Sequence, residues 1–271
     1  MRILMNTKIK AVALFWLATL ICLPLAMSNV LAADMASLVN TAGMQRMLTQ
    51  RITKDYLFLG SQIRAGKAGR QMKGSVALLR SNHDVLKQSV TDSKVSSLLV
   101  EVDPLLEKME KITKAAYVKF SGATMLELSE SMLELYQAIV VELEGKQAEK
   151  TVAAVNTAGR QRMLSQRIAM FYAAQQAGFQ SDTTINQMKQ SVDEFESAHK
   201  ALEVNSLNSE EINRELQGVE NVWKTVRPYF AGDAEESFPV TIFVTTDDIM
   251  KRMNKVTLLY VKAHWASKPK Q

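Results

Sequence analysis

The chain repeats the segment Asn40-Thr-Ala-Gly-Met-Gln-Arg-Met-Leu-Thr-Gln-Arg-Ile52 as Asn156-Thr-Ala-Gly-Arg-Gln-Arg-Met-Leu-Ser-Gln-Arg-Ile168. Eleven of the thirteen positions agree, and the spacing of 116 residues continues without a gap to Leu86 and Leu202. Self-similarity at a fixed spacing is the signature of a repeated structural unit, so the sequence predicts two related domains in tandem. We expect them to cover residues 33–147 and 148–267, each within the usual size of a domain.

Both copies have the composition of helical proteins. Ala, Leu, Met, Glu, Lys and Gln dominate, and apolar residues recur every three or four positions, which is the spacing along one helix face. We therefore predict an all-α fold of two tandem antiparallel four-helix bundles. The expected helices of the first copy span residues 35–63, 71–90, 104–120 and 124–145. Those of the second copy end near 176, span 184–203, span 209–228 and end near 265.

Three local patterns bear on the helix ends. Asp103 and Pro104 together predict a helix start, with aspartate as the N-cap and proline at the first helical position. The β-branched residues of Pro239–Thr246 favour an extended segment before the last helix. Only Gly145 and Thr151 weaken the stretch between the two copies, so the last helix of the first copy is expected to run nearly continuously into the second.

The first 32 residues have the pattern of a signal peptide. A positive region with Arg2, Lys8 and Lys10 precedes the apolar run Ala11–Cys22, and Val30-Leu-Ala32 fits a small-residue cleavage site. We expect cleavage after this site and export to the periplasm. The alternative, an uncleaved membrane anchor, stays open at this point.

Export changes the charge balance. The whole chain carries +5, but three of its 33 basic residues lie in the leader, leaving 30 against 28 acidic residues, about +2. No basic stripe remains that would indicate nucleic-acid binding. The only cysteine, Cys22, leaves with the signal peptide, so we expect neither a disulfide nor a thiolate metal site in the mature protein.

The repeated segment places its distinctive residues on one helix face. At 100° per residue, Gly43, Arg46 and Gln50 fall on one stripe, and the second copy repeats it with Gly159, Arg162 and Gln166. Arginine carries a planar fork of donors that suits a planar oxyanion, and Gln and Asn add neutral donors. The alternative is that each arginine pairs with a carboxylate of a neighbouring helix, drawn from Glu127, Glu130 and Glu134.

These residues resemble the first-helix signature of the PilJ/NarX-type sensor domain. That domain lies at the periplasmic end of type IV pilus methyl-accepting chemotaxis transducers and nitrate/nitrite sensor kinases. The resemblance is close over both signatures and looser over the rest of each copy. It implies a four-helix bundle in which an anion lies between two first helices across a dimer interface, held by the signature arginine. Carried over, that residue is Arg46 in one copy and Arg162 in the other, with Gly43 and Gly159 permitting close approach.

The leading hypothesis is a periplasmic sensory protein that binds a small oxyanion, with nitrate or nitrite as first candidates. The two signature helices of one chain would form a pseudo-two-fold site, and a separate membrane-bound chemoreceptor or sensor kinase would carry the signal. The candidate ligand-binding residues are Asn40, Gly43, Arg46, Gln50, Asn156, Gly159, Arg162 and Gln166.

The second hypothesis is an interaction module without a small ligand, whose glycine stripe docks a membrane receptor or a pilus component. A homodimer is kept open as a separate alternative. An enzyme is the weakest reading. His83 and His199 repeat at the spacing of 116, but they lack the metal-ligand and nucleophile motifs that catalysis requires. We expect no catalytic residue, no metal and no cofactor.

Overall fold

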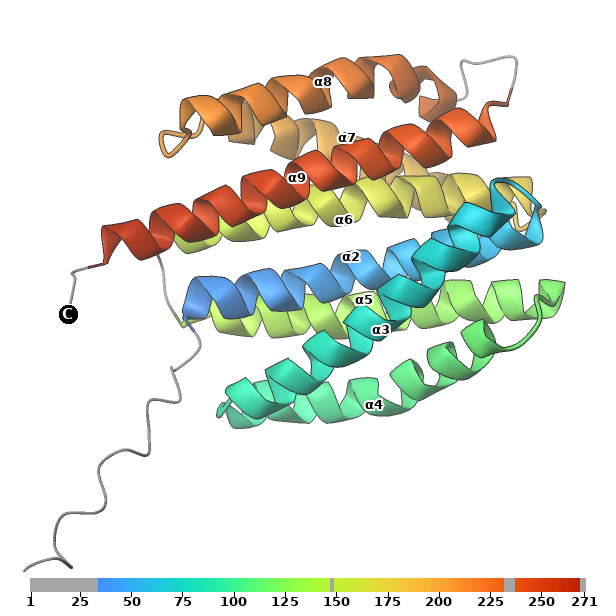
Figure 1. The fold of residues 1–271 in the computed structure, drawn as a ribbon, viewed down its shortest axis with the longest axis horizontal. Coiled ribbons are helices and arrows are strands. Elements are labelled where there is room, and N and C mark those ends of the chain that lie inside the picture. Colours follow the sequence, from blue (N-terminus) through green and yellow to red (C-terminus); the bar gives the residue numbers. More distant parts are fainter. Residues whose placement is uncertain (1–33, 147–148, 232–236, 269–271) are drawn as a thin grey trace, which may run out of the picture. The chain divides into compact units, whose positions relative to one another are not determined.

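A computed structural model describes residues 34–146, 149–231 and 237–268. This part of the chain is entirely helical apart from its turns, and it contains no strand. The all-α prediction is confirmed (Figure 1). The helices are α2 (Met35–Gly60), α3 (Ala65–Ser89), α4 (Ser93–Lys114), α5 (Lys119–Gly145), α6 (Lys150–Gln176), α7 (Asp182–Glu203), α8 (Glu210–Ala231) and α9 (Pro239–Ser267).

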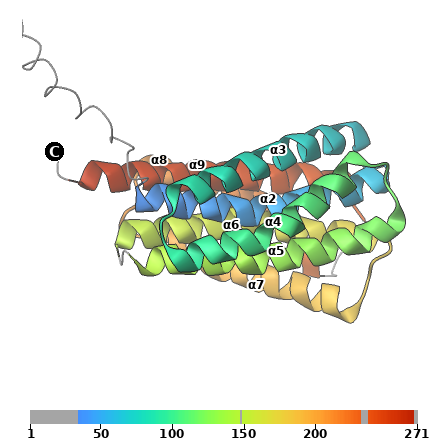
Figure 2. The ribbon, with the colours of Figure 1, turned by 90° about the horizontal axis from the view of Figure 1, so that it is seen from below.

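The helices pack as two antiparallel four-helix bundles. In the first, α2 packs on α3 and α5, while α4 packs on α5 and α3. In the second, α6 packs on α7 and α9, while α8 packs on α9 and α7. Helix α2 also packs along α6, so the two bundles share an extensive interface, and Figures 1 and 2 show these helices side by side.

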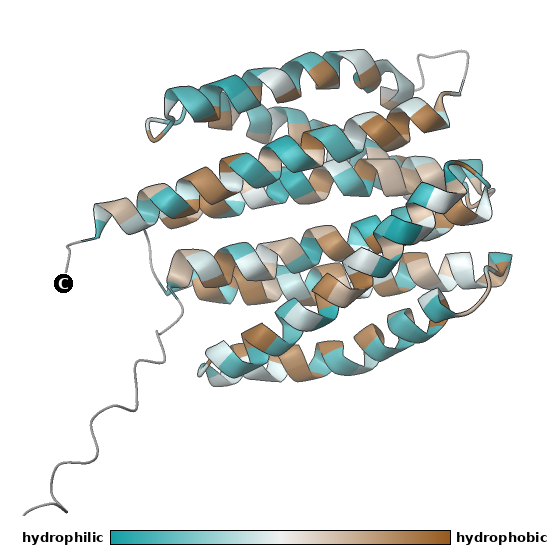
Figure 3. Cartoon of the chain, viewed as in Figure 1, coloured by the Kyte–Doolittle hydropathy of each residue, from teal (hydrophilic) through white to brown (hydrophobic). Residues whose placement is uncertain are grey.

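The signature helices α2 and α6 are buried on nearly every side. Of the 26 residues of α2, 18 are buried, and so are 18 of the 27 in α6, against six of the 25 in α3. Hydrophobic and hydrophilic residues alternate around the helices in Figure 3, but most of the polar residues of α2 and α6 are buried or half-buried. Their side chains must therefore find partners inside the protein.

The two signature helices run parallel and in register. Arg46 of α2 contacts Asn156 near the start of α6, and Arg162 of α6 contacts Asn40 near the start of α2. Each contact therefore joins a position of one copy to the equivalent level of the other. An approximate two-fold axis that runs parallel to α2 and α6 relates the two copies, as in a parallel dimer.

The predicted start of the third helix is wrong, and α3 and α5 begin five or six residues before their predicted starts. Helix α4 begins at Ser93, where the Oδ1 atom of Asp92 accepts a hydrogen bond of 2.9 Å from the backbone nitrogen of Val95. Pro104 lies inside the helix instead of opening it. Proline leaves the carbonyl four residues earlier without a donor, but Val100 at that position is 59% exposed, so water can replace the missing hydrogen bond.

Two further local expectations are corrected. The segment Pro239–Thr246 is the first part of α9 and not an extended wall. Ile242, Phe243 and Thr246 are buried there, so packing outweighs the weak preference of β-branched residues. Helices α5 and α6 are separate and antiparallel, because α6 must turn back to lie along α2 (Figure 1).

The predicted signal peptide, residues 1–32, lies outside the described residues. Among the helices that the structure does describe, none is long and apolar enough to cross a membrane.

The end of α2 supplies a test of the packing. A Cβ atom at Gly60 would lie 2.1 Å from the ring of Tyr117, whereas one at Gly74 would meet nothing within 4 Å. We expect Gly60→Ala to lower the free energy of unfolding by about 1–3 kcal/mol, the usual cost of overpacking. Gly74→Ala should raise it by up to about 1 kcal/mol, because alanine favours the helix. Urea denaturation measures both; equal midpoints would contradict the close packing of Tyr117 on α2.

Candidate functional site

Two fully buried arginines lie next to one another between α2 and α6. Arg46 and Arg162 both have no exposed surface. A Cβ atom at Gly43 would lie 3.2 Å from Nη2 of Arg46 and 3.8 Å from Nη2 of Arg162. The two nitrogens are therefore no more than about 7 Å apart. Gly159 faces the same pair, at 3.7 Å from Arg162 and 3.8 Å from Arg46, so each glycine leaves room for both guanidinium groups.

Neutral amides hold Arg46. Its Nη1 atom donates to Oε1 of Gln137 on α5 at 2.5 Å, and its Nη2 atom donates to Oδ1 of Asn156 on α6 at 2.9 Å. Asn156 in turn donates to Glu144 at 2.5 Å. The nearby carboxylate of Glu144 thus reaches this arginine through an amide and does not pair with it directly.

The same arrangement holds Arg162. Its Nη1 atom donates to Oδ1 of Asn254 on α9 at 2.6 Å and to Oδ1 of Asn40 on α2 at 3.3 Å. Its Nη2 atom donates to the backbone oxygen of Asn40 at 3.3 Å. The sequence analysis does not predict Gln137 and Asn254 as residues of the site. The available signal was their separation of 117 residues on the last helix of each copy, which is close to the repeat spacing.

No carboxylate of the described residues forms an ion pair with either arginine. The alternative, in which these arginines pair with the acidic series on α5, is therefore wrong for both residues, because Glu130 instead makes a bidentate pair with Arg167. The Nε atoms of Arg46 and Arg162 are buried and have no hydrogen-bond partner. Buried charges usually require an opposite charge, so this site holds donors and positive charge in excess of its acceptors.

The electrostatic cost appears in the pKa values of both groups. Burial, together with the charge of Arg162, lowers the pKa of Arg46 from 12.5 to about 9. Burial lowers the pKa of Arg162 to about 10. Both groups remain cationic at neutral pH. An anion between them would offset the desolvation and the mutual repulsion, which gives the site its chemical preference.

The signature glutamines lie one helical turn farther along. Nε2 of Gln50 donates to Oγ of Ser129 at 2.8 Å, and Nε2 of Gln166 donates to the backbone oxygen of Thr246 at 3.0 Å. The oxygen of Gln166 accepts from Lys54 at 2.8 Å. The structure thus brings together the predicted arginines, asparagines and glycines. It places both glutamines beside them, where they tie each signature helix to the last helix of its own bundle.

Two ion pairs cross between the bundles at equivalent positions. Arg167 of α6 pairs with Glu130 of α5, and Arg51 of α2 lies 3.9 Å from Asp247 of α9. Each signature helix therefore contacts an acidic residue of the other copy. These pairs help to fix the parallel register that brings the two buried arginines to the same level.

A second buried charged cluster joins Lys54 and Asp55 of the first copy to Asp247 of the second. Lys54 donates to Asp247 at 2.7 Å and lies 3.4 Å from Asp55. The carboxylate oxygens of Asp55 are buried without a hydrogen-bond partner. Burial raises the pKa of Asp55 from 3.8 to about 6. The equivalent positions of the second copy hold Met170 and Phe171, so this cluster breaks the two-fold relation.

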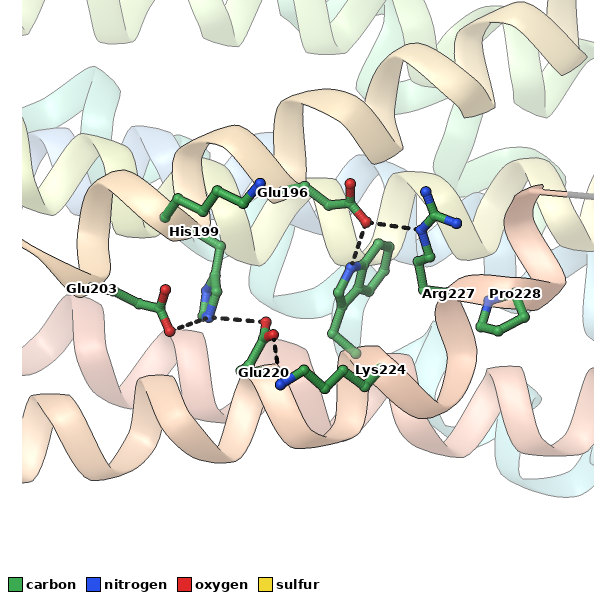
Figure 4. Close-up of a pocket in the computed structure, with 9 residues that line it drawn as sticks. Glu196, His199, Glu203, Glu220, Lys224, Arg227 and Pro228 are labelled. Carbon is green, nitrogen blue, oxygen red and sulfur yellow. Dashed lines mark hydrogen bonds and ion pairs between the residues drawn. The ribbon is translucent and has the colours of Figure 1, made fainter.

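A cleft of about 310 Å³ lies between α7 and α8 (Figure 4). His199 faces it, and neither ring nitrogen has a hydrogen-bond partner. Its Nε2 atom lies 3.7 Å from Glu203 and 3.8 Å from Glu220. Burial lowers the pKa of His199, which favours the neutral imidazole.

The matching histidine of the first copy is fully bonded. The ring nitrogens of His83 lie 3.0 Å from the hydroxyl of Tyr136 and 2.9 Å from Asp103. Met253 occupies the place of Tyr136 in the second copy, at a spacing of 117. Within the described residues no group of three His, Cys, Asp or Glu side chains is arranged to hold a metal ion. Both histidines belong to the second helix of a copy, His83 to α3 and His199 to α7.

The glycine stripe does not form an outer surface. Gly43 and Gly159 are buried, and the nearest side-chain atoms to each belong to the two arginines. The face that a docking partner would need is covered by the other copy within the same chain. The arginine pair is therefore the better-supported candidate site.

A family model described as the N-terminal domain of type IV pili methyl-accepting chemotaxis transducers matches residues 32–129 and 145–241. The two matched segments correspond to the two copies. This family consists of non-catalytic modules for sensing and signal transduction. Comparison with curated proteins and with solved structures gave no match.

The cluster around Asp55 generates a test by pH. A carboxyl group whose pKa is raised on folding binds its proton more tightly in the folded state, so stability falls as pH rises from about 4 to about 6. Asp55→Asn removes this loss. Relative to the wild type, the variant should gain stability between pH 4 and pH 7, by up to about 3 kcal/mol for a pKa shift of two units.

Urea denaturation at several pH values measures this gain, and Asp193→Asn, at an exposed aspartate of α7, is the control. A difference between Asp55→Asn and the wild type that does not change with pH would show that the carboxylate is ionised in the folded protein at pH 4.

Proposed function

Because the chain belongs to the family of type IV pili methyl-accepting chemotaxis transducer N-terminal domains, we propose that it is a periplasmic sensor of a small oxyanion. Nitrate and nitrite are the first candidates. The anion binds between α2 and α6, and a separate membrane-bound chemoreceptor or sensor kinase reads the bound state. The signal peptide in residues 1–32 supplies the export that this location requires.

One observation carries the proposal: Arg46 and Arg162 are buried side by side and held only by neutral oxygens. A guanidinium group offers five N–H donors in one plane. Two such groups match a planar anion with three oxygens or two. A singly charged anion also costs less to remove from water than a doubly charged one such as sulfate, which favours nitrate or nitrite.

The other site residues have complementary roles. The amide groups of Asn40 and Asn156 now offer their oxygens to the arginines, and rotation would present N–H donors to a bound anion. Gly43 and Gly159 leave room for the two guanidinium groups to lie between α2 and α6. Gln50 and Gln166 complete the proposed set by fixing each signature helix against the last helix of its bundle.

Thermal unfolding of the exported form, residues 33–271, in low-chloride buffer tests the site. Nitrate at a hundred times its dissociation constant should stabilise the wild type by about 2.7 kcal/mol. Arg46→Gln and Arg162→Gln should abolish that gain. Without anion, each variant should be as stable as the wild type or more stable, because one of two like buried charges is gone.

Arg80→Gln, which removes a partly exposed arginine paired with Glu110, is the matched control and should respond to nitrate as the wild type does. Chloride and sulfate provide the comparison of anions. If neither nitrate nor nitrite stabilises the wild type, or if both arginine variants keep the full gain, the proposed site is wrong.

The two glycines give a finer test of the geometry. A methyl group at Gly43 would lie 3.2 Å from Nη2 of Arg46, whereas one at Gly159 would lie 3.7 Å from the nearest guanidinium nitrogen. We expect Gly43→Ala to displace Arg46 and weaken nitrate binding several-fold. Gly159→Ala should leave binding nearly unchanged and raise stability by about 1 kcal/mol through helix propensity. Titration calorimetry with nitrate measures both affinities; equal losses would contradict the unequal spacing.

A further inference from the structure

Two surface grooves flank the arginine pair at equivalent positions. The first, of about 400 Å³, lies between α2, α3 and α9, and the second, of about 200 Å³, lies between α6, α7 and α5. Equivalent lining residues of the two grooves are 116 positions apart in the sequence on the first two helices of each copy, and 117 positions apart on the last helix. Matching pairs in the two linings are Met44 and Arg160, Met47 and Met163, Gly74 and Gln190, Leu78 and Glu194, Lys251 and Glu134, and Asn254 and Gln137.

Each groove ends at an amide that holds one of the arginines. Asn254 lines the first groove and accepts from Arg162 at 2.6 Å. Gln137 lines the second groove and accepts from Arg46 at 2.5 Å. Both guanidinium groups are fully buried, so each amide stands between a groove and the site.

The two grooves differ in charge. The first is lined by Arg51, Arg70 and Lys251 and by no acidic residue. The second contains Glu134 and Glu194 as well as basic residues, and Arg160 crosses it to pair with Glu194 at 2.7 Å. A positively charged cleft concentrates anions and speeds their approach, whereas carboxylates oppose it. Only the first groove is both open and favourable for an anion.

We propose that the groove between α2, α3 and α9 is the route by which the anion enters and leaves the arginine pair, with Asn254 as its inner gate. The proposal rests on the proposed function, because it takes the arginine pair as the binding site. It concerns the path that the anion takes and not the affinity of the site for the anion. It also explains the difference at Met44 and Arg160, where the two signatures diverge: methionine leaves one groove open, and arginine closes the other with an ion pair.

A bulky side chain in the route tests this by kinetics. Gly74 lines the first groove, and a Cβ atom there meets nothing within 4 Å, so Gly74→Trp adds a bulky side chain at the groove without a clash at its Cβ atom. Gln190→Trp places the same group at the equivalent position of the second groove and is the matched control. The buried Nε–H groups of Arg46 and Arg162 serve as NMR probes, and their line shapes during titration with nitrate give both rate constants.

An obstacle on the only route slows entry and exit by the same factor and leaves the dissociation constant unchanged. We expect Gly74→Trp to slow both rates on the order of tenfold, a barrier increase of about 1.4 kcal/mol, while Gln190→Trp retains the rates of the wild type. Unchanged rates in Gly74→Trp, or equal slowing in both variants, would overturn the proposed route with the binding site intact. Absence of any nitrate effect in the wild type would overturn the site itself, and the route with it.

Discussion

The structure depends on two positive charges held side by side in the centre of the protein. Burying one guanidinium group is costly, and a second one nearby adds repulsion in a medium that screens poorly. Arg46 and Arg162 are tolerated because four helices supply oxygen atoms around them: α2, α5, α6 and α9. This requirement accounts for the central position of the two signature helices. A helix on the periphery of a bundle could not be approached by acceptors from three directions.

Because the two copies are joined in one chain, a substitution in one half of the interface leaves the sequence of the other half unchanged. In a homodimer every substitution occurs twice, at symmetric places. Here Lys54 and Asp55 form a buried charged cluster, while the second copy has Met170 and Phe171 at those positions. The grooves beside the arginine pair diverge in the same way. The features shared by both copies, by contrast, are the arginines, glycines and asparagines of the interface, where each copy completes the surroundings of the other.

The sequence predicted the helical fold and the residues at its centre, because an exact spacing over 47 positions needs no knowledge of packing. It could not predict which acceptor each arginine reaches. Glu130 and Gln137 are both on α5. Only the register of α5 against α6 places Glu130 at Arg167, and only its register against α2 places Gln137 at Arg46. The predicted starts of α4 and α9 are wrong for a related reason: burial of a complete helix face outweighs the local preferences of proline and β-branched residues.

The position of the arginine pair also determines how binding can act on the rest of the molecule. A ligand shifts a conformational equilibrium only through a difference in its affinity for the two states. Both arginines lie at the contact between the copies, and neither lies within a single bundle core. The two charges oppose close packing of α2 on α6, and an anion bound between them, as proposed, would favour it. Under the proposed function, a response to an oxyanion would therefore pass through the packing of one copy against the other. It would act directly on the last helices α5 and α9, which hold the arginines through Gln137 and Asn254.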